Sequence, residues 1–242
     1  GMVRYAVLAD IHANLQALEA VCADVRRAGA ERMLCLGDIV GYGADPRECL
    51  QMVRDLNATI VAGNHDWATV GRLNVDYFNS DARDSVHWTR SVLSTDEVAF
   101  LKNLDLINVL DGVTLVHGSP FSPDCFEYIQ TNYDVEVAFE HLATPLCFVG
   151  HSHVPVIFEH TDPVDYFVRD EYEVPDDRQV IVNVGSVGQP RDLDPRASYV
   201  VYDDRERTVT TRRVEYDVST ASSRIVEAGL PSTNSVRIVL GR

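Results

Sequence analysis

Three short apolar segments in the first third of the chain each end in a polar motif, and helical segments separate them. The apolar segments span residues 3–9, 33–36 and 59–62, and the polar motifs bring Asp10, Asp38 and Asn64 directly after them. Between them, the apolar residues are spaced as on a helix with one buried face. Alternating short apolar strands and amphipathic helices predict β-α-β units around a buried, mostly parallel sheet.

The remaining segments predict further helices and strands. Helices are expected at 82–93, from 94 onwards, at 134–142 and at 218–228, with a weak helical pattern in the tail. Capping boxes are expected to start helices at Asp45 and Ser94, and Asp111-Gly112 between two apolar segments predicts a tight hairpin. Strand-like segments after residue 155 indicate a second sheet, mixed or antiparallel.

Residues 161–178 form the one irregular, acidic insertion. We expect it to be a solvated loop with a short strand near 166–168, and an active-site lid is the alternative. No linker or low-complexity tract divides the chain. Because 242 residues suffice for one large core, a single domain spanning 1–242 is predicted.

The charge balance excludes some partners. The chain has 21 Lys and Arg against 37 Asp and Glu, for a net charge of −16. Non-specific binding to nucleic acid or to an anionic membrane needs clustered basic residues, so both are disfavoured. An anionic substrate is still compatible, because cations held by carboxylates reverse the local charge. The five cysteines form no C-x-x-C pair and no apolar run approaches a bilayer span, which is typical of a reduced, cytoplasmic protein.

Five of the eight histidines stand directly after apolar segments. Ligands of open α/β sheets bind beyond the carboxyl ends of the strands, so side chains at these ends are expected to converge at one edge. The converging set is Asp10, His12, Asp38, Asn64, His117, His151 and His153.

Imidazole, carboxylate and amide donors without a thiolate suit divalent Mn, Fe, Co, Ni or Zn. One ion has no use for seven protein ligands, whereas two ions that share a bridging carboxylate can use them all and still hold water. Two-metal sites of this kind produce hydroxide near neutral pH and stabilise both oxygens of an in-line displacement. The motifs therefore predict a two-metal centre suited to phosphoester hydrolysis.

The ordered motifs D-x-H, G-D, G-N-H, H and G-H-x-H resemble those of the calcineurin-like metallophosphoesterase superfamily. Residues 183–191 and 194–199 look like the closing strand-loop-strand of its compact bacterial and archaeal phosphodiesterase-type branch. The resemblance implies an α/β (α+β) fold, a two-sheet β-sandwich flanked by helices in four αββα layers. It also implies a metal-dependent phosphodiesterase or phosphatase for small organic phosphates, with two divalent ions, manganese among the candidates, and a metal-bridging hydroxide.

The resemblance assigns roles to individual residues. It implies that Asp10, His12 and His153 hold one metal, that Asn64, His117 and His151 hold the other, and that Asp38 bridges them. His65 is implied to contact the phosphate or to protonate the leaving oxygen, which makes it, with Asp38, a catalytic candidate.

The substrate-binding candidates are Asn64, His65, Arg191 and Asn14. For Arg191 the alternative is a structural ion pair, and for Asn14 it is simple helix capping. Tyr42 is a candidate for the pocket wall, with an exposed loop aromatic as the alternative. Asp66 is expected to cap a helix, or to orient His65 or an outer-shell group.

Two phosphate-binding arginines of better known relatives are missing. Ile39-Val40-Gly41 follows Asp38 where protein Ser/Thr phosphatases and symmetrical diadenosine tetraphosphatases carry Asp-Arg-Gly, and Ala62 replaces an arginine before Gly63-Asn64. A diester or small organic phosphate is therefore favoured as the small-molecule substrate. The alternatives are a dinucleoside polyphosphate hydrolase, a non-catalytic interaction module on the same fold and a hydrolase of carbon esters or amides. The motifs specify no oligomeric state.

Overall fold

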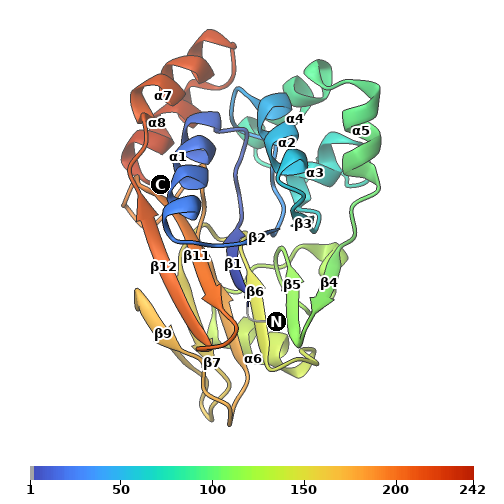
Figure 1. Cartoon of the computed structure of the whole chain (residues 1–242). Coiled ribbons are helices and arrows are strands. Elements are labelled where there is room, and N and C mark those ends of the chain that lie inside the picture. Colours follow the sequence, from blue (N-terminus) through green and yellow to red (C-terminus); the bar gives the residue numbers. More distant parts are fainter. Residues whose placement is uncertain (1–2) are drawn as a thin grey trace.

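The computed structural model describes residues 3–242. In this part of the chain two mixed six-stranded sheets pack face to face and eight α-helices flank them (Figure 1). The expected α/β sandwich with outer helices is confirmed.

The first sheet has the strand order β3-β2-β1-β11-β12-β9. Strands β1, β2 and β3 are parallel, and β11 pairs antiparallel with β1. The strands are β1 (Arg4–Leu8), β2 (Arg32–Cys35), β3 (Thr59–Ile60), β9 (Glu171–Glu173), β11 (Ala197–Asp203) and β12 (Thr208–Val214).

The second sheet has the order β4-β5-β6-β10-β7-β8. Strands β5, β6 and β10 are parallel, and the hairpin and edge strands pair antiparallel. The strands are β4 (Ile107–Leu110), β5 (Val113–Val116), β6 (Leu146–Val149), β7 (Val156–Glu159), β8 (Asp165–Phe167) and β10 (Val180–Asn183).

Helices cover the outer faces of the sandwich and one of its ends. In Figure 1, α3, α4 and α8 lie at this end, above the strands. Within the described residues, no helix has the length and apolar content needed to cross a bilayer. The helices are α1 (Leu15–Arg27), α2 (Pro46–Asp55), α3 (Asn64–Thr69), α4 (Ser80–Val92), α5 (Thr95–Lys102), α6 (Asn132–Glu140), α7 (Val218–Glu227) and α8 (Ser232–Leu240), with a short 3₁₀ turn at Pro123–Cys125.

Strand β1 shows why the apolar segments are continuous rather than alternating. Tyr5 and Val7 point into the core between the sheets, whereas Ala6 and Leu8 pack with Leu18 of α1 in the outer core. Successive side chains of a strand point to opposite faces, so a strand covered on both faces must be apolar throughout. A third core beneath α6 covers the outer face of the second sheet.

The expectation of a separate sheet after residue 155 is wrong. Strands β7, β8 and β10 extend the second sheet, whereas β9, β11 and β12 complete the first. The chain passes from one layer of the sandwich to the other, and local sequence patterns do not specify such non-local pairing. The 161–178 insertion is a solvated loop only in part, because β8 and β9 lie within it and form one edge of each sheet.

The capping predictions have different outcomes. The box at Ser94 is confirmed, because its hydroxyl accepts from the Glu97 N–H at 3.2 Å and the Glu97 carboxylate accepts from the Ser94 N–H at 2.8 Å. The box at Asp45 is wrong, because that carboxylate forms no cap and instead accepts hydrogen bonds from Arg224 of α7. The Asp111-Gly112 hairpin joins β4 and β5 as predicted.

Candidate metal centre

The polar motifs follow the carboxyl ends of strands from both sheets. Asp10 comes two residues after β1, Asp38 three residues after β2, and Asn64 opens α3 beyond β3. His117 directly follows β5, and His151 comes two residues after β6. The parallel strands direct these ends of both sheets to one end of the sandwich, which brings the distant motifs together.

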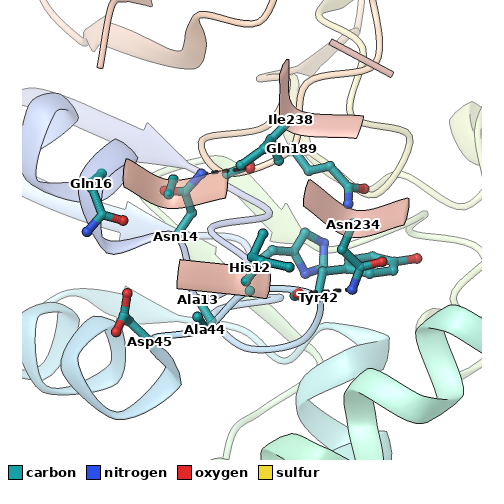
Figure 2. Close-up of a pocket in the computed structure, with 14 residues that line it drawn as sticks. His12, Ala13, Asn14, Gln16, Tyr42, Ala44, Asp45, Gln189, Asn234 and Ile238 are labelled. Carbon is teal, nitrogen blue, oxygen red and sulfur yellow. Dashed lines mark hydrogen bonds between the residues drawn. The ribbon is translucent and has the colours of Figure 1, made fainter. Parts of the chain in front are cut away.

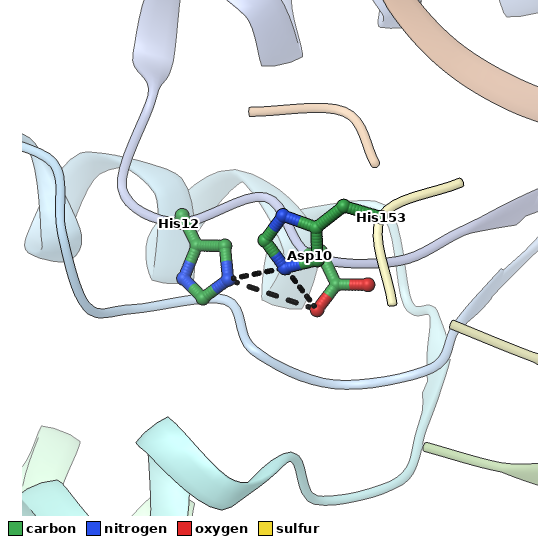
Figure 3. Close-up of side chains that lie close together, drawn as sticks. All are labelled: Asp10, His12 and His153. Carbon is green, nitrogen blue, oxygen red and sulfur yellow. Dashed lines mark hydrogen bonds and ion pairs between the residues drawn. The ribbon is translucent and has the colours of Figure 1, made fainter. Parts of the chain in front are cut away.

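Asp10, His12 and His153 form the first group of side chains (Figure 3). The Asp10 Oδ1 lies 3.3 Å from the His153 Nε2 and 3.7 Å from the His12 Nε2. The two Nε2 atoms are 3.2 Å apart, and all three side chains are buried. Each therefore points one ligand atom at the same small volume.

Asp38, His117 and His151 form the second group. The His117 Nε2 lies 3.2 Å from both the Asp38 Oδ2 and the His151 Nδ1. The same Asp38 oxygen is 3.6 Å from the Nε2 of His12 in the first group. Asp38 thus faces both groups, which is compatible with the predicted bridging role. The Asp10 Oδ1 also lies 3.7 Å from the His117 Nε2 of the second group.

Backbone carbonyls hold the outer nitrogen of each of the four imidazoles. A carbonyl only accepts hydrogen bonds, so each outer nitrogen carries the proton, and the inner nitrogen of a neutral ring offers a lone pair to the centre. The bonds run from His12 Nδ1 to Val40 at 3.1 Å, from His117 Nδ1 to Leu36 at 2.7 Å, from His151 Nε2 to Phe126 at 2.8 Å and from His153 Nδ1 to Gln189 at 2.6 Å.

Burial keeps most of these imidazoles neutral. It lowers the pKa of His12 and His153 and lowers that of His151 to about 3. At His117 burial acts in the same direction, but the carboxylates of Asp38 and Asp10 outweigh it and raise the pKa to about 10. A proton on His117 thus provides the positive charge that the two carboxylates demand in the protein alone.

The centre holds more acceptors than donors, which is the observation that fits metal ions. Within residues 3–242, the buried Oδ1 atoms of Asp10 and Asn64 have no hydrogen-bond partner. Inward lone pairs and carboxylate oxygens gathered in a dry site are costly unless a cation satisfies them. The two Asp-His-His groups therefore fit two divalent ions, and the individual ligand roles stay predictions.

The backbone at the site is unusual. Asp10, His12, Asp38, His151 and His153 all have positive φ, between 48° and 74°. Residues other than glycine visit this left-handed region rarely, and such strained residues cluster at functional sites. The apolar strands predicted where these residues stand, but not the left-handed turns that aim them inward.

Asp66 links the two loops that carry Asp38 and Asn64. Its carboxylate accepts from the N–H groups of Asp38 at 2.8 Å, Ile39 at 3.0 Å, Val40 at 3.3 Å and Gly63 at 3.0 Å. The expected helix cap is present, and the same carboxylate also fixes the loop of the bridging residue. The sequence motifs indicated the helix cap but not this link to the Asp38 loop.

His65 lies beside the first group with its ring 4.9 Å from that of His12 and 4.6 Å from that of Tyr42. The backbone N–H of His65 donates to the Asp38 Oδ1 at 2.8 Å. Within residues 3–242, the ring Nδ1 of His65 has no hydrogen-bond partner. Burial lowers the pKa of His65 to about 4, although the Asp38 carboxylate acts against this. The imidazole is therefore neutral at neutral pH.

Asn14 has the capping role rather than a free amide. Its Oδ1 accepts from the Ala17 N–H at 3.1 Å, and its Nδ2 donates to the Gly188 carbonyl at 3.0 Å and to the Tyr216 hydroxyl at 3.2 Å. It lines a cavity of about 10 Å³, room for one water, together with His12 and Tyr42 (Figure 2). We therefore leave Asn14 out of the proposed substrate contacts.

Arg191 is not in the structural ion pair that was its alternative. Within the described residues its guanidinium binds no carboxylate and donates instead to the Gln189 Oε1, at 2.8 Å from Nη2. Its carbon Cζ lies 6.0 Å from the centre of the Tyr42 ring. Its charge also lowers the pKa of His65 and His153, which places it beside the metal centre.

A cavity of about 400 Å³ opens next to the metal centre. Asn64, His65 and His151 form its floor. Aromatic side chains form much of the remaining wall, and the Tyr128 ring stacks on His151 with the centres 3.8 Å apart. The aromatic residues that line it are Tyr42, Tyr77, Phe78, Phe126 and Tyr128.

Residues 3–207 match the calcineurin-like phosphoesterase superfamily domain. The chain belongs to this superfamily. It is 39% identical to an uncharacterized protein of Methanocaldococcus jannaschii over 98% of both chains. It is also similar to a metallophosphoesterase from Sphaerobacter thermophilus, with 40% identity, complete coverage of both chains and a TM-score of 0.89. A hypothetical protein from Pyrococcus horikoshii, 21% identical over 100% of this chain and 99% of that one, shares the fold with a TM-score of 0.80.

Membership in the calcineurin-like phosphoesterase superfamily confirms the resemblance that the ordered motifs indicated. It supports the hydrolysis of phosphoesters in general, and the two Asp-His-His groups support metal binding.

Proposed function

We propose that this calcineurin-like phosphoesterase holds two divalent cations and hydrolyses phosphodiesters or other small organic phosphates. The observation that carries the proposal is the pair of buried Asp-His-His groups, in each of which the ligand atoms lie within 4.8 Å of one another. The Asp38 Oδ2 lies 3.2 Å from the His117 Nε2 and 3.6 Å from the His12 Nε2, so this carboxylate contacts both groups. Mn, Fe, Co, Ni and Zn suit these donors, and we propose Mn²⁺ for the first tests.

Bound cations would lower the pKa of a coordinated water and neutralise charge on the phosphoryl group. The chain contributes the geometry, since backbone carbonyls fix the four imidazole tautomers and the Asp66 carboxylate fixes the Asp38 loop. The proposed ligands are Asp10, His12 and His153 for one cation, and Asn64, His117 and His151 for the other, with Asp38 shared.

His65 is proposed to bind the phosphoryl group as a neutral hydrogen-bond donor. Its low pKa of about 4, caused by burial, disfavours a protonated imidazole waiting to act as a general acid. Its ring lies among His12, Tyr42 and Phe78, which hold it at the floor of the aromatic cavity. Of the two roles implied by the resemblance, this environment favours contact with the phosphate.

The aromatic cavity supports an organic ester rather than a bare inorganic phosphate as the substrate. Its volume of about 400 Å³ is that of a small-molecule site. The exposed Tyr77, the stacked Tyr128 and Phe78 offer apolar faces to a group attached to the phosphorus. Placing that group here brings its phosphate next to His65 and Asn64.

The test is hydrolysis of bis-p-nitrophenyl phosphate and of p-nitrophenyl phosphate by the full chain. Metal-stripped protein is expected to be inactive, and Mn²⁺ to restore diester hydrolysis in a panel with Fe, Co, Ni and Zn. Equal rates with and without metal for every phosphoester would overturn the proposal. Two metal equivalents without turnover of any ester would favour the non-catalytic module, whereas turnover of p-nitrophenyl acetate alone would favour the carbon-ester hydrolase.

His117→Ala provides the matched variant, because this buried ligand candidate is expected to lose bound metal together with activity. His141→Ala removes an imidazole at the exposed end of α6 and is the control. Metal content measured by mass spectrometry and the rate of diester hydrolysis should both fall in the first variant and stay unchanged in the second.

A further inference from the structure

Two arginines lie beside Tyr42, and within the described residues neither forms an ion pair with an Asp or Glu side chain. Arg237 donates its Nε–H to the Arg242 main-chain oxygen at 3.0 Å. Arg191 belongs to the loop after β10, and Arg237 belongs to α8. Their Cζ atoms are 6.0 Å and 5.7 Å from the centre of the Tyr42 ring. By contrast, Arg212, Arg213 and Arg224, from the same third of the chain, each bind an aspartate.

Contacts on both sides hold this pair in place. The Asn234 Nδ2 of α8 donates to the Tyr42 carbonyl at 3.0 Å, as Figure 2 shows, and Arg237 follows three residues later on the same face of the helix. The Arg191 N–H donates to the His153 carbonyl at 3.1 Å. The backbone of Arg191 is thus attached to the His153 loop of the metal centre, and the helix that carries Arg237 is attached to the Tyr42 loop.

The position is electrostatically unfavourable for two cations. Burial lowers the pKa of Arg237, and the charge of Arg191 lowers it further, against the smaller effects of Tyr42 and Asp81. Two partly buried guanidinium groups that pair with no Asp or Glu side chain keep a local positive charge, which a bound anion would neutralise.

We propose that Arg191 and Arg237 form a second anion subsite, for a substrate that carries a further phosphate besides the phosphoester at the metal centre. Arginine suits this role because its planar guanidinium binds two phosphate oxygens at once. The subsite would supply phosphate contacts from the last third of the chain in place of the two arginines missing near Asp38 and Ala62. This inference rests on the proposed function for its substrate class.

The first experiment measures binding and needs no turnover. Inorganic pyrophosphate is titrated calorimetrically into the full chain without added metal. Arg191→Gln and Arg237→Gln are each expected to raise the Kd about tenfold or more, the effect of losing a charged hydrogen-bond partner. Arg237→Lys should recover part of the affinity, and Arg26→Gln, at an exposed position of α1, should bind like the wild type. No binding by the wild type, or an unchanged Kd in Arg237→Gln, would overturn the subsite.

The second experiment uses two substrates that differ by one phosphate, thymidine 5′-(p-nitrophenyl phosphate) with and without a 3′-phosphate. The wild type is expected to have the lower KM for the doubly phosphorylated ester, and Arg237→Gln should reduce the ratio of the two KM values towards one. A ratio unchanged by Arg237→Gln contradicts the subsite. If no protein turns over either ester, the bis-p-nitrophenyl phosphate and p-nitrophenyl phosphate assays decide the proposed function, and the pyrophosphate titration decides the subsite.

Discussion

Two polar clusters of this phosphoesterase are both built around buried aspartates, but the carboxylates are satisfied in only one of them. On the outer face of the first sheet, the Asp24 carboxylate accepts from the Tyr199 hydroxyl at 2.7 Å and from the Arg212 guanidinium at 2.6 Å and 3.1 Å. Every acceptor there has a donor from the chain. In the metal centre, by contrast, carboxylates and inward lone pairs face one another, and the Oδ1 of Asp10 has no partner within residues 3–242.

The backbone differs in the same way. Asp24 lies within α1, while Tyr199 and Arg212 lie on the adjacent strands β11 and β12, so ordinary secondary structure presents all three. Asp10 and Asp38 instead require left-handed turns, with φ of 54° and 55°. In a cluster that stabilises the fold, side chains on regular secondary structure satisfy one another's hydrogen bonds. A binding site instead contains strained backbone turns that leave acceptors free for a ligand.

Replacing the carboxylate at the heart of each cluster gives the largest expected contrast. Asp38→Asn keeps the shape but removes the charge between the two groups, so we expect kcat/KM for bis-p-nitrophenyl phosphate to fall by about 10³-fold, roughly 4 kcal/mol. Bound metal should fall with it, because a neutral amide bridges cations poorly.

Asp24→Asn should leave both the rate and the metal content unchanged, which makes it the control for Asp38→Asn. Steady-state kinetics and metal analysis on the two variants check the comparison. Full activity in Asp38→Asn would remove the basis for treating its cluster as the reaction centre.

Six of the seven predicted ligands gather in two groups, and the sequence indicated this convergence because each of them follows an apolar strand. Strand ends are a local signal, and parallel strands bring their ends to one edge whatever their separation along the chain. The predictions that were wrong depended on contacts between distant parts of the chain, or on which partner a side chain binds. Asp45 has every feature of a helix cap, yet Arg224, some 180 residues later, binds its carboxylate instead.

The strands after residue 155 show the same limit. β10 and β11 have similar apolar patterns, but one joins β6 in the second sheet and the other joins β1 in the first. Both faces of each strand are covered, so hydrophobicity does not tell the layers apart. Arg237 was missed for a related reason, because only the packing of α8 over the Tyr42 loop brings it to the site.

A smaller effect is expected from crowding the loop of the bridging carboxylate. A Cβ at Gly63 would lie 2.1 Å from the Asp38 Oδ1 and 2.4 Å from its backbone nitrogen. Gly63→Ala must therefore displace Asp38, and we expect metal affinity to fall about 10- to 100-fold, as when a ligand loses its support. Metal titration monitored by calorimetry measures the change.

Gly112→Ala is the matched control for Gly63→Ala. Gly112 has φ of 79° in the β4–β5 turn, and a Cβ there would meet no atom within 4 Å. Its replacement should cost about 1 kcal/mol of stability through backbone strain and leave metal affinity unchanged. Equal metal affinities in the two variants would show that Asp38 tolerates displacement.

The smallest expected effect lies in the self-satisfied cluster and depends on pH. The hydrogen bond from Arg212 lowers the pKa of Asp24 below its ordinary value of 3.8. A carboxyl with a depressed folded-state pKa contributes stability above its unfolded pKa of about 4, and this contribution is lost as the pH falls through the lower, folded value. We therefore expect Asp24→Asn to lower the free energy of unfolding by roughly 1 kcal/mol at pH 7, given the partial exposure of Arg212. Urea denaturation of metal-free protein between pH 7 and pH 3 should show the difference shrinking at the acid end. A constant difference would mean that the aspartate contributes by shape alone, and the contrast with the metal centre would then rest on backbone strain rather than on charge.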